Sequence, residues 1–396
     1  MLDKLPAVCI IVENLPVPFD RRVWQEARSL RDAGYRVSVI SPRGKGYERN
    51  YEVCEGIEIY RHGVWEASGA AGYLLEYSWS LTMEFLLTSR VFLKTQFKIL
   101  QICNPPDLIF LVAVFFKLFG VRLIFDHHDL NPELYEAKLG RRSGILYTLI
   151  CWAERLTYKA ADVSIATNDS YREIALTRGR MDPRRVFTVR SCPDLKDLRV
   201  SPTPALKQGK PYLVVYLGVM GQQEGLGLLL EAIEYIVKER RRKDVCFVMI
   251  GDGTEKPYLQ ARCAAMGLDR VVTFTGKLNS AEYAPYLSTA DVCVASDPKN
   301  LMNDKSTMNK ILDYMAYGRP TVLFELTEGR RSAGDAALYA RPNDPMDFAE
   351  QILKLLNSEP LRRQLGECGR KRIEGRLNWE MEKVAFLAAY AAASNA

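Results

Sequence analysis

The stretch 245-VCFVMIGDGTEKPYLQARCAAMGLDRVVTFTG-276 decides the fold that we expect for this chain. Its beginning, Val245–Ile250, is wholly apolar and predicts a buried strand. A turn with two glycines follows, then a helical pattern over Pro257–Met266 and a second strand over Val271–Thr275. Two apolar strands joined by a helix predict parallel neighbours in a sheet that helices cover on both faces.

The same alternation of strand and helix runs along the rest of the sequence, with one interruption. Residues 199–211 are rich in proline and polar side chains, which is typical of a linker. We therefore predict two doubly wound, Rossmann-like α/β domains over residues 1–198 and 212–375, with ligands at the carboxyl ends of the strands in a cleft between them. A last helix, within residues 376–396, is expected to pack back on the first domain. The other expected strands are Ala7–Val12, Val37–Ile40, Leu108–Val112, Leu123–Phe125, Val163–Ala166, Val186–Val189, Leu213–Leu217 and Val292–Ala295.

The composition indicates a folded protein without a dense basic surface. The 396 residues are 48% hydrophobic, and 54 basic against 48 acidic residues give a net charge of +6. Because this excess is small for the length of the chain, we expect no nucleic-acid partner. The nine cysteines include no Cys-x-x-Cys pair, so we expect no zinc site and a reducing compartment.

The apolar stretches of the first half predict buried elements in preference to a membrane span. The first one ends at Glu13 and is too short for a secretory signal, which favours a cytoplasmic location. Leu108–Phe125 is interrupted by Lys117 and Arg122 and is shorter than the roughly 20 residues of a spanning helix, so a buried helix and a buried strand explain it better. Trp65–Gln101 predicts either buried helices or an amphipathic element that touches the inner face of the membrane, and both alternatives stay open.

Gly251 and Gly253 form a Gly-x-Gly turn directly after a strand. Glycines there allow backbone N–H groups to approach a ligand, and the next helix would favour an anion. Lys256 stands where a dinucleotide fingerprint has its third glycine, so a tight strand-to-helix turn is an equal alternative.

A second candidate, 303-NDKSTMNKILDYMAYGRP-320, predicts a helix that begins after a strand. Ser306 or Thr307 can cap this helix, and its N-terminus suits a diphosphate. Lys310 and Asp313 are three residues apart and share a polar edge, where the carboxylate can accept hydrogen bonds from ribose hydroxyls. A solvated Lys–Asp pair is the alternative.

A third candidate, 126-DHHDLNPE-133, contains two of the three histidines in the chain and directly follows an expected strand. A histidine in such a position can donate a hydrogen bond to a sugar hydroxyl or stabilise developing charge. Because His127 and His128 are adjacent, they point apart on a strand, and we expect no metal site.

The fourth candidate is the loop 13-ENLPVPFDRR-22 after the first strand. Asp20 can cap the helix that follows. We place Asn14, Asp20 and Arg21 on the side of the acceptor or the phosphate, because an arginine can meet an anion there. Arg21 and Arg22 in a solvated first helical turn are the alternative.

These four stretches, in this order, resemble the retaining glycosyltransferases of family four, which have the two-domain GT-B fold. The resemblance covers nearly the whole chain and is most specific at residues 126–133, 248–253, 274–276 and 309–320. It implies transfer of a sugar from a UDP- or GDP-sugar donor, bound mainly by the second domain, to a saccharide or lipid-linked acceptor on the first. Such enzymes work without a cofactor, and similar ones build bacterial surface polysaccharides or modify lipids and natural products.

The resemblance also implies roles for single residues. It makes His128 the residue that contacts the donor sugar, and we group Asp129 with it as catalytic. Asp313 matches the carboxylate that binds the ribose. The remaining donor-binding positions are Gly218, in the first strand-end loop of the second domain, and Thr307, Met308 and Asn309, which present backbone N–H groups to phosphate.

The sequence departs from the family pattern at three positions. Lys305 stands for the first motif glutamate, and Val219 and Glu224 stand for the usual basic pair. Phosphate charge would then be met by Lys305, Lys310 or Arg21. Two alternatives to an active transferase stay open, a nucleotide-sugar epimerase that recruits Asp126 and Glu133 as acid and base, and a non-catalytic subunit.

Overall fold

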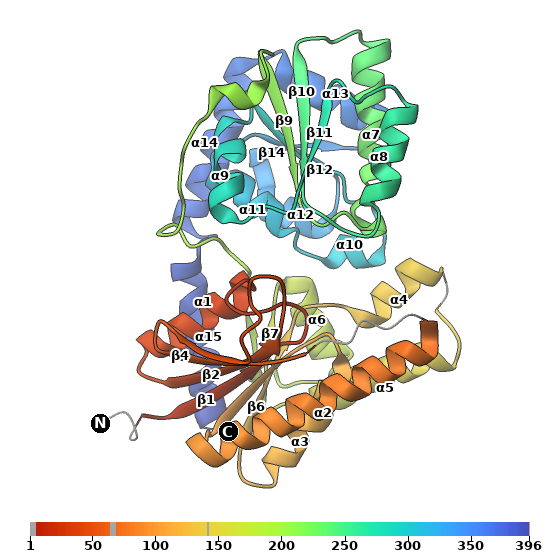
Figure 1. Ribbon diagram of the computed structural model, residues 1–396. Helices are drawn as coiled ribbons and strands as arrows, with labels where there is room; N and C mark the ends of the chain where they lie inside the picture. The colour runs from red at the N-terminus through yellow and green to blue at the C-terminus, as the bar shows by residue number, and fades with distance from the viewer. Residues whose placement is uncertain (1–4, 64–68, 141, 396) are drawn as a thin grey trace. The chain divides into compact units, whose positions relative to one another are not determined.

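The computed structural model describes residues 5–63, 69–140 and 142–395. The chain splits into two compact units, Met1–Ser191 with Glu380–Ala396 and Cys192–Trp379, here called the first and second unit. Each unit is an α/β domain built on a largely parallel sheet (Figure 1). The predicted fold class of two doubly wound, Rossmann-like domains is therefore confirmed.

The first unit contains an eight-stranded sheet of order β3-β4-β2-β1-β5-β6-β7-β8. Its strand pairings are parallel apart from the β3–β4 hairpin. The strand order reverses at β1, which pairs with β2 on one side and β5 on the other, and ligands of doubly wound sheets bind at such a reversal. The strands are β1 (Ala7–Ile11), β2 (Arg36–Pro42), β3 (Tyr51–Cys54), β4 (Ile57–His62), β5 (Ile99–Cys103), β6 (Arg122–His127), β7 (Val163–Ala166) and β8 (Val186–Thr188). The α-helices are α1 (Arg21–Asp32), α2 (Gly69–Thr95), α3 (Phe110–Lys117), α4 (Asn131–Leu139), α5 (Ile145–Ala160), α6 (Asp169–Thr177) and α15 (Trp379–Ser394).

The second unit contains a six-stranded, all-parallel sheet of order β11-β10-β9-β12-β13-β14. Its order reverses at β9, between β10 and β12. The strands are β9 (Tyr212–Leu217), β10 (Val245–Ile250), β11 (Val272–Gly276), β12 (Val292–Ala295), β13 (Thr321–Phe324) and β14 (Ala337–Ala340). The α-helices are α7 (Leu226–Glu234), α8 (Lys256–Ala265), α9 (Ser280–Thr289), α10 (Leu301–Lys305), α11 (Asn309–Ala316), α12 (Thr327–Ala333), α13 (Pro345–Leu356) and α14 (Glu359–Gly375).

Near-continuous apolar strands build both cores. Every residue of β1 and of β10 is buried, as expected for central strands of a sheet covered on both faces. Helices complete each core with one apolar side, for example α7 with Leu229, Leu230 and Ile233. Within the described ranges, no helix has the length and the apolar run that crossing a membrane requires.

The strand predicted over Leu108–Val112 is wrong. Those residues form a 3-10 turn and the beginning of α3, and the strand of this region is β5, Ile99–Cys103. The sequence hides β5 because Gln101 interrupts its apolar run, although Gln101 is fully buried. Of the stretch Trp65–Gln101, the residues 65–68 lie outside the described part, and the remainder is mostly α2 and β5.

Residues 199–211, expected to form a linker, pack on the second unit. The backbone N–H groups of Ser201 and Thr203 donate to the hydroxyls of Ser288 (2.9 Å) and Thr289 (2.8 Å). The units divide earlier, between Ser191 and Cys192. Polar side chains at the end of α9 thus satisfy the backbone of a segment whose composition resembles a free linker.

The last helix, α15, contributes to the core of the first unit. Its residues Phe386, Ala389, Tyr390 and Ala393 are fully buried. The Tyr390 hydroxyl donates to Gln101 Oε1 on β5 (2.6 Å). The end of the chain is therefore bonded to the middle of the first sheet.

Three loops at the carboxyl edge of the second sheet approach each other through glycines. A Cβ on Gly251, which has a φ of +144°, would lie 1.8 Å from the carbonyl oxygen of Gly218. A Cβ on Gly253 would lie 2.4 Å from Met220 O, and one on Gly225 would lie 2.3 Å from Ser296 O. Only glycine permits these backbone contacts.

We therefore expect Gly251→Ala to lower the free energy of unfolding by about 2–4 kcal/mol, because the methyl group would overlap a backbone carbonyl. Gly375→Ala, in α14 with open space around its Cα, is the matched control and should stay within about 0.5 kcal/mol of wild type. Denaturant unfolding measures both, and equal stabilities of the two variants would contradict the loop packing described here.

Candidate active site

The polar residues that the sequence singled out fall into two clusters, one at the carboxyl edge of each sheet. The cluster of the first unit involves the ends of β5, β6 and β8 and the beginning of α1. The cluster of the second unit involves the ends of β9 and β12 and the beginning of α11. Each is described here on its own.

A buried ion pair between Arg22 and Asp126 forms the centre of the first cluster. Asp126 is fully buried near the end of β6, and Arg22 is 7% exposed in the first turn of α1. The guanidinium binds both carboxylate oxygens, with Nη2 2.7 Å from Oδ1 and Nε 3.1 Å from Oδ2. It also donates to the carbonyl of Val189 (2.8 Å) and to the hydroxyl of Ser191 (3.2 Å) after β8. Arg22 is therefore neither solvated nor available to a phosphate.

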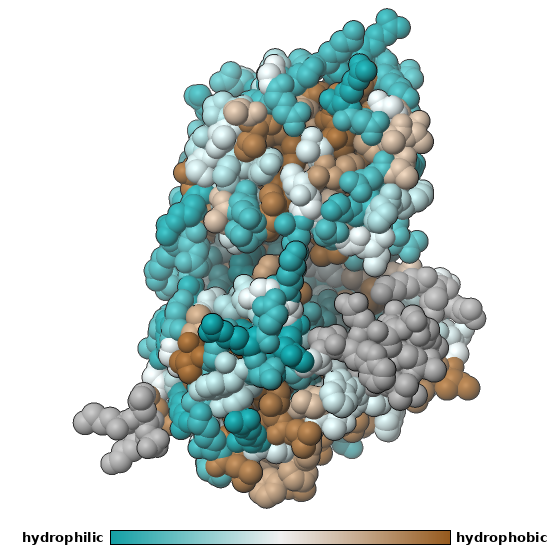
Figure 2. All heavy atoms as spheres, viewed as in Figure 1, coloured by the Kyte–Doolittle hydropathy of each residue, from teal (hydrophilic) through white to brown (hydrophobic). Residues whose placement is uncertain are grey.

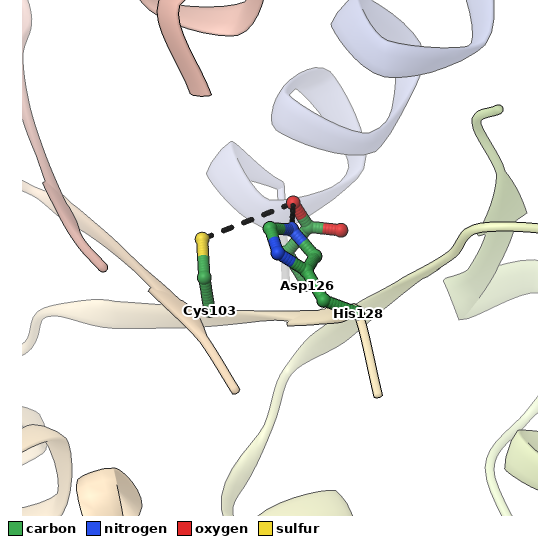
Figure 3. A group of neighbouring side chains, drawn as sticks. All are labelled: Cys103, Asp126 and His128. Carbon is green, nitrogen blue, oxygen red and sulfur yellow. Dashed lines mark hydrogen bonds and ion pairs between the residues drawn. The ribbon is translucent and has the colours of Figure 1, made fainter. Parts of the chain in front are cut away.

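His128 shares this carboxylate (Figure 3). Its Nε2 lies 2.7 Å from Asp126 Oδ2, and its side chain is 14% exposed. Burial opposes the charge of Asp126, but the positive charge of Arg22 and the hydrogen bonds from His128 and Arg22 hold the pKa of this carboxyl below its ordinary value. An ionised carboxylate only accepts hydrogen bonds, so a proton on His128 Nε2 suits this pair, while Arg22 Nε lies 3.1 Å from the same nitrogen. The other ring nitrogen, Nδ1, makes no hydrogen bond to any described residue and is left to a ligand.

Asn104, after β5, fixes the backbone on which His128 stands. Its Oδ1 accepts from the backbone N–H groups of His128 (2.7 Å) and Asp129 (3.2 Å), and its Nδ2 donates to the carbonyl of Asp129 (2.7 Å). His127 points into the core instead, where its Nδ1 bonds to the Tyr158 hydroxyl (2.7 Å). Burial lowers the pKa of His127 to about 3, so this histidine stays neutral.

A second carboxylate, Glu26, lies beside the ion pair. Arg22 Nε is 3.1 Å from Glu26, and the Gln101 amide donates to both Glu26 (2.7 Å) and Asp126 (3.2 Å). Burial and the charge of Asp126 raise the pKa of Glu26 well above its ordinary value, although Arg22 opposes them. One arginine thus holds one ionised carboxylate and one that resists ionisation.

The ligand atoms of Cys103, Asp126 and His128 lie within 4.8 Å of one another (Figure 3), as in a metal site. Both oxygens of Asp126 already accept from Arg22, whose fixed positive charge would repel a cation. Burial, and the charge of Asp126 after it, raise the pKa of Cys103 well above its ordinary value, so its thiol stays protonated. These surroundings do not suit a metal ion.

In the loop before α1, Asp20 forms the N-cap of the helix, as predicted, and accepts from the N–H of Val23 (3.1 Å). Asn14 is exposed and Arg21 half-buried. In α4, Glu133 is buried and paired with Arg178 (3.0 Å), which also binds Glu154. Glu133 is therefore already committed to an ion pair.

The second cluster surrounds Lys310, which is 9% exposed and lies in the first turn of α11. Its Nζ is 3.0 Å from Asp297 Oδ1, contacts the carboxylate of Glu224, and lies 4.8 Å from the centre of the Tyr216 ring. The Tyr216 hydroxyl lies 3.0 Å from Glu224. The alternative of a solvated Lys310–Asp313 pair is wrong, because both residues are buried.

Two carboxylates face one ammonium group in this cluster, and their pKa values separate. Burial, together with the charge of Glu224, raises the pKa of Asp297 to about 7. Burial also opposes ionisation of Glu224, but Lys310 outweighs it and lowers the pKa of Glu224. The positive charge of Lys310 is therefore neutralised inside the protein.

Met308, and not Ser306 or Thr307, is the N-cap residue of α11, and its side chain makes no capping hydrogen bond. The Ser306 hydroxyl instead donates to the carbonyl of Met302 in α10 (2.8 Å). Asn309, the first residue of α11, is exposed, whereas Lys305 and Thr307 are half-buried. The side chain of the N-cap residue therefore satisfies none of the first N–H groups of α11.

The glycines of the second cluster use their N–H groups within the protein. Gly218 and Gly251 donate to the carbonyls of Ile250 (3.0 Å) and Gly276 (2.9 Å). Gly253 donates to the side chain of Asp252 (2.9 Å). Of the two interpretations of the Gly-x-Gly turn, the structure favours the tight turn.

The sequence reasoning missed Arg22, Asn104, Tyr216 and Asp297 as members of these clusters. For Asp297 a signal was present, since it stands just past the end of a buried strand, as Asp126 stands near the end of another. For Arg22 there was none, because an arginine at the start of a helix is usually solvated.

Sequence profiles of two families match the chain. The profile described as "Glycosyl transferase 4-like domain" matches residues 20–191, and the one described as "Glycosyl transferases group 1" matches residues 211–358. Both descriptions name glycosyl transferases, and together the two matches span most of the chain. The clusters at His128 and Lys310 both lie within the matched residues.

Known proteins agree with these matches. The chain is 23% identical to alpha-D-kanosaminyltransferase of Streptomyces kanamyceticus over 54% of its own length and 56% of that protein. Among solved structures, sucrose-phosphate synthase of Thermosynechococcus elongatus superposes with a TM-score of 0.77 at 18% identity, over 98% of each chain. Anabaena HepE in complex with UDP-glucose superposes with a TM-score of 0.70 at 11% identity, over 97% of this chain and 99% of that one. These structural likenesses establish the GT-B fold.

We expect Lys310→Met to lower the free energy of unfolding by about 3–5 kcal/mol, because it leaves two buried carboxylates without a counter-charge. The triple variant Lys310→Met/Glu224→Gln/Asp297→Asn removes all three charges and should recover most of that loss. Denaturant unfolding at neutral pH compares the two. A single variant as stable as wild type would show that Lys310 does not neutralise this cluster.

Proposed function

We propose that this protein transfers a glycosyl group from a nucleoside diphosphate sugar to an acceptor hydroxyl, with retention at the anomeric carbon. The observation that carries the proposal is the placement of His128, held by Asp126 at the carboxyl edge of the sheet in a glycosyl transferase 4-like domain. In the overall reaction, the acceptor oxygen forms a bond to the anomeric carbon, and the bond between this carbon and the diphosphate oxygen breaks. The proton of the acceptor hydroxyl leaves with the diphosphate. The acceptor attacks on the face that the diphosphate leaves.

His128 is assigned to the transferred sugar. With its proton on Nε2 directed at Asp126, its Nδ1 can accept a hydrogen bond from a sugar hydroxyl. The Arg22–Asp126 pair orients the ring, so little reorganisation is needed when charge develops in the transition state. Asp129, whose backbone is fixed by Asn104, is the second candidate at this edge.

The nucleotide is assigned to the second unit. The N-terminus of α11, with Met308 and Asn309, would supply N–H groups and a partial positive charge to the diphosphate. Lys305, at the end of α10, is the other cation assigned to the diphosphate, since the charge of Lys310 is already neutralised. Asp313 is assigned to the ribose. A UDP-sugar is the favoured donor, because the similar HepE was solved with UDP-glucose.

The donor assignment predicts that nucleotide sugars raise the unfolding temperature. Ligand at about 100 times its dissociation constant adds about 2.7 kcal/mol to stability. We expect UDP-sugars to stabilise the wild type in a thermal-shift screen that includes GDP-sugars and free UDP. Asp313→Asn, which keeps the shape of the side chain, should unfold like wild type without ligand and lose at least half of the stabilisation. Full stabilisation of the variant would remove Asp313 from the donor site.

His128→Ala should lower turnover at least about tenfold, as for loss of one positioned polar contact near a reacting centre. The affinity for UDP should stay unchanged, because the histidine contacts the sugar and not the nucleotide. The assay measures UDP released with and without an acceptor. UDP release that does not depend on an acceptor would overturn the proposed transfer. Epimerisation of the sugar instead of its transfer would also overturn it. Turnover near wild type would show that His128 is structural.

A further inference from the structure

The outer face of α2, α3 and α5 in the first unit is apolar. Helix α3 contacts both of the other helices. On it Leu111, Val114 and Phe115 are 41–54% exposed, and Leu118 (81%) and Phe119 (53%) directly follow it. The neighbouring helices add Leu86, Leu93, Ile145, Leu146, Leu149 and Trp152, all more than half exposed. Figure 2 shows hydrophobic surface over the region of α2 and α3. Monomeric proteins seldom expose so many large apolar side chains on neighbouring helices unless these helices contact something.

Among the described side chains of these three helices, the charges that reach the surface have one sign. Over residues 78–95, 110–117 and 145–160, the acidic side chains of Glu84 and Glu154 are fully buried. The charged side chains that reach the surface there are all basic, namely Arg90, Lys94, Lys117, Arg155 and Lys159. Exposed apolar and basic groups without exposed acidic ones match an anionic, amphipathic partner.

Beside this face lies a pocket of about 490 Å³ with a basic lining. Arg155 and Lys159 of α5 line it together with Arg180 and Arg185 from the loop between α6 and β8. These four side chains are exposed and have no hydrogen bond or ion pair with any described residue. The one acidic residue of the lining, Asp182, is already paired with Arg184 (2.7 Å). The pocket therefore presents unneutralised positive charge, which suits phosphate groups.

The pocket and the apolar face adjoin. Lys117 Nζ donates to the carbonyl of Ala160 (2.6 Å), so the end of α3 lies against the end of α5. The strongly exposed Leu118 directly follows Lys117, and Lys159 of the pocket directly precedes Ala160. Phosphate-binding and apolar groups are thus next to each other, as the headgroup and acyl region of a phospholipid are.

We propose that this face docks the protein on a bilayer that contains anionic phospholipids, with headgroup phosphates in the basic pocket and the α2–α3–α5 side chains in the acyl boundary. Burial of apolar area and attraction to anionic headgroups add together in such docking. A second copy of the chain fits this face less well, because a symmetric contact would set the unpaired cations of one copy against those of the other. The proposal does not depend on the proposed glycosyl transfer.

The test is flotation of the full chain with vesicles of phosphatidylcholine, with and without phosphatidylglycerol. We expect strong binding to the anionic vesicles and weak binding to the neutral ones. Each basic side chain near an anionic leaflet contributes about 1 kcal/mol, so Arg155→Gln/Lys159→Gln/Arg180→Gln/Arg185→Gln should weaken binding at least about 50-fold. Leu118→Ser/Phe119→Ser should weaken it at least about tenfold, since two exposed apolar side chains are removed from the interface.

The matched control is Arg241→Gln/Arg270→Gln/Lys354→Gln/Lys371→Gln, which removes four exposed, unpaired cations of the second unit. It changes net charge by the same amount and should bind vesicles within about twofold of wild type. Unfolding temperatures of all variants should match, because the changed side chains are exposed. Equal loss in both quadruple variants, or no binding of wild type to anionic vesicles, would overturn the proposal. The proposal would also be overturned if the wild type were a dimer, and if Leu118→Ser/Phe119→Ser separated this dimer into monomers without weakening vesicle binding.

Discussion

The buried ion pair between Arg22 and Asp126 connects separate segments of the first unit. It joins α1 to β6, reaches the end of β8 through Val189, and orients the ring of His128. Gln101 extends the same network to Tyr390 of the last helix. A buried charge without its partner costs several kcal/mol, so the ion pair stabilises a single arrangement of these segments. The candidate catalytic histidine therefore stands on a rigid support.

The second unit also contains a buried cluster of charged side chains, with one lysine and two carboxylates. Lys310 faces two buried carboxylates, so the cluster stays neutral only if one of them keeps a proton, and the raised pKa of Asp297 fits that need. A lysine occupied in this way cannot also neutralise a diphosphate. This moves the proposed phosphate contacts to the start of α11 and to Lys305.

Polar chemistry and membrane contact use different parts of the first unit. The carboxyl edge of its sheet holds Asp126 and His128, whereas the helix face of α2, α3 and α5 holds the exposed apolar residues. The basic pocket of Arg155, Lys159, Arg180 and Arg185 belongs to that helix face. A parallel sheet permits this separation. Polar loops follow the carboxyl ends of its strands, whereas the helices that cover the sheet can carry different residues on their outer surface.

The sequence by itself determined the alternation of strands and helices, the two Rossmann-like domains and the stretches from which the candidate site is built. It could do so because apolar periodicity, glycine turns and helix caps are local. It misplaced β5, where one buried glutamine interrupts the apolar pattern, and it took the packed segment 199–211 for a free linker. Only the tertiary structure decided that Arg22 and Lys310 are buried and already paired, since Asp126 and Asp297, their partners, are distant in sequence. Which charges remain for a ligand is a property of such long-range pairs, and no local pattern encodes it.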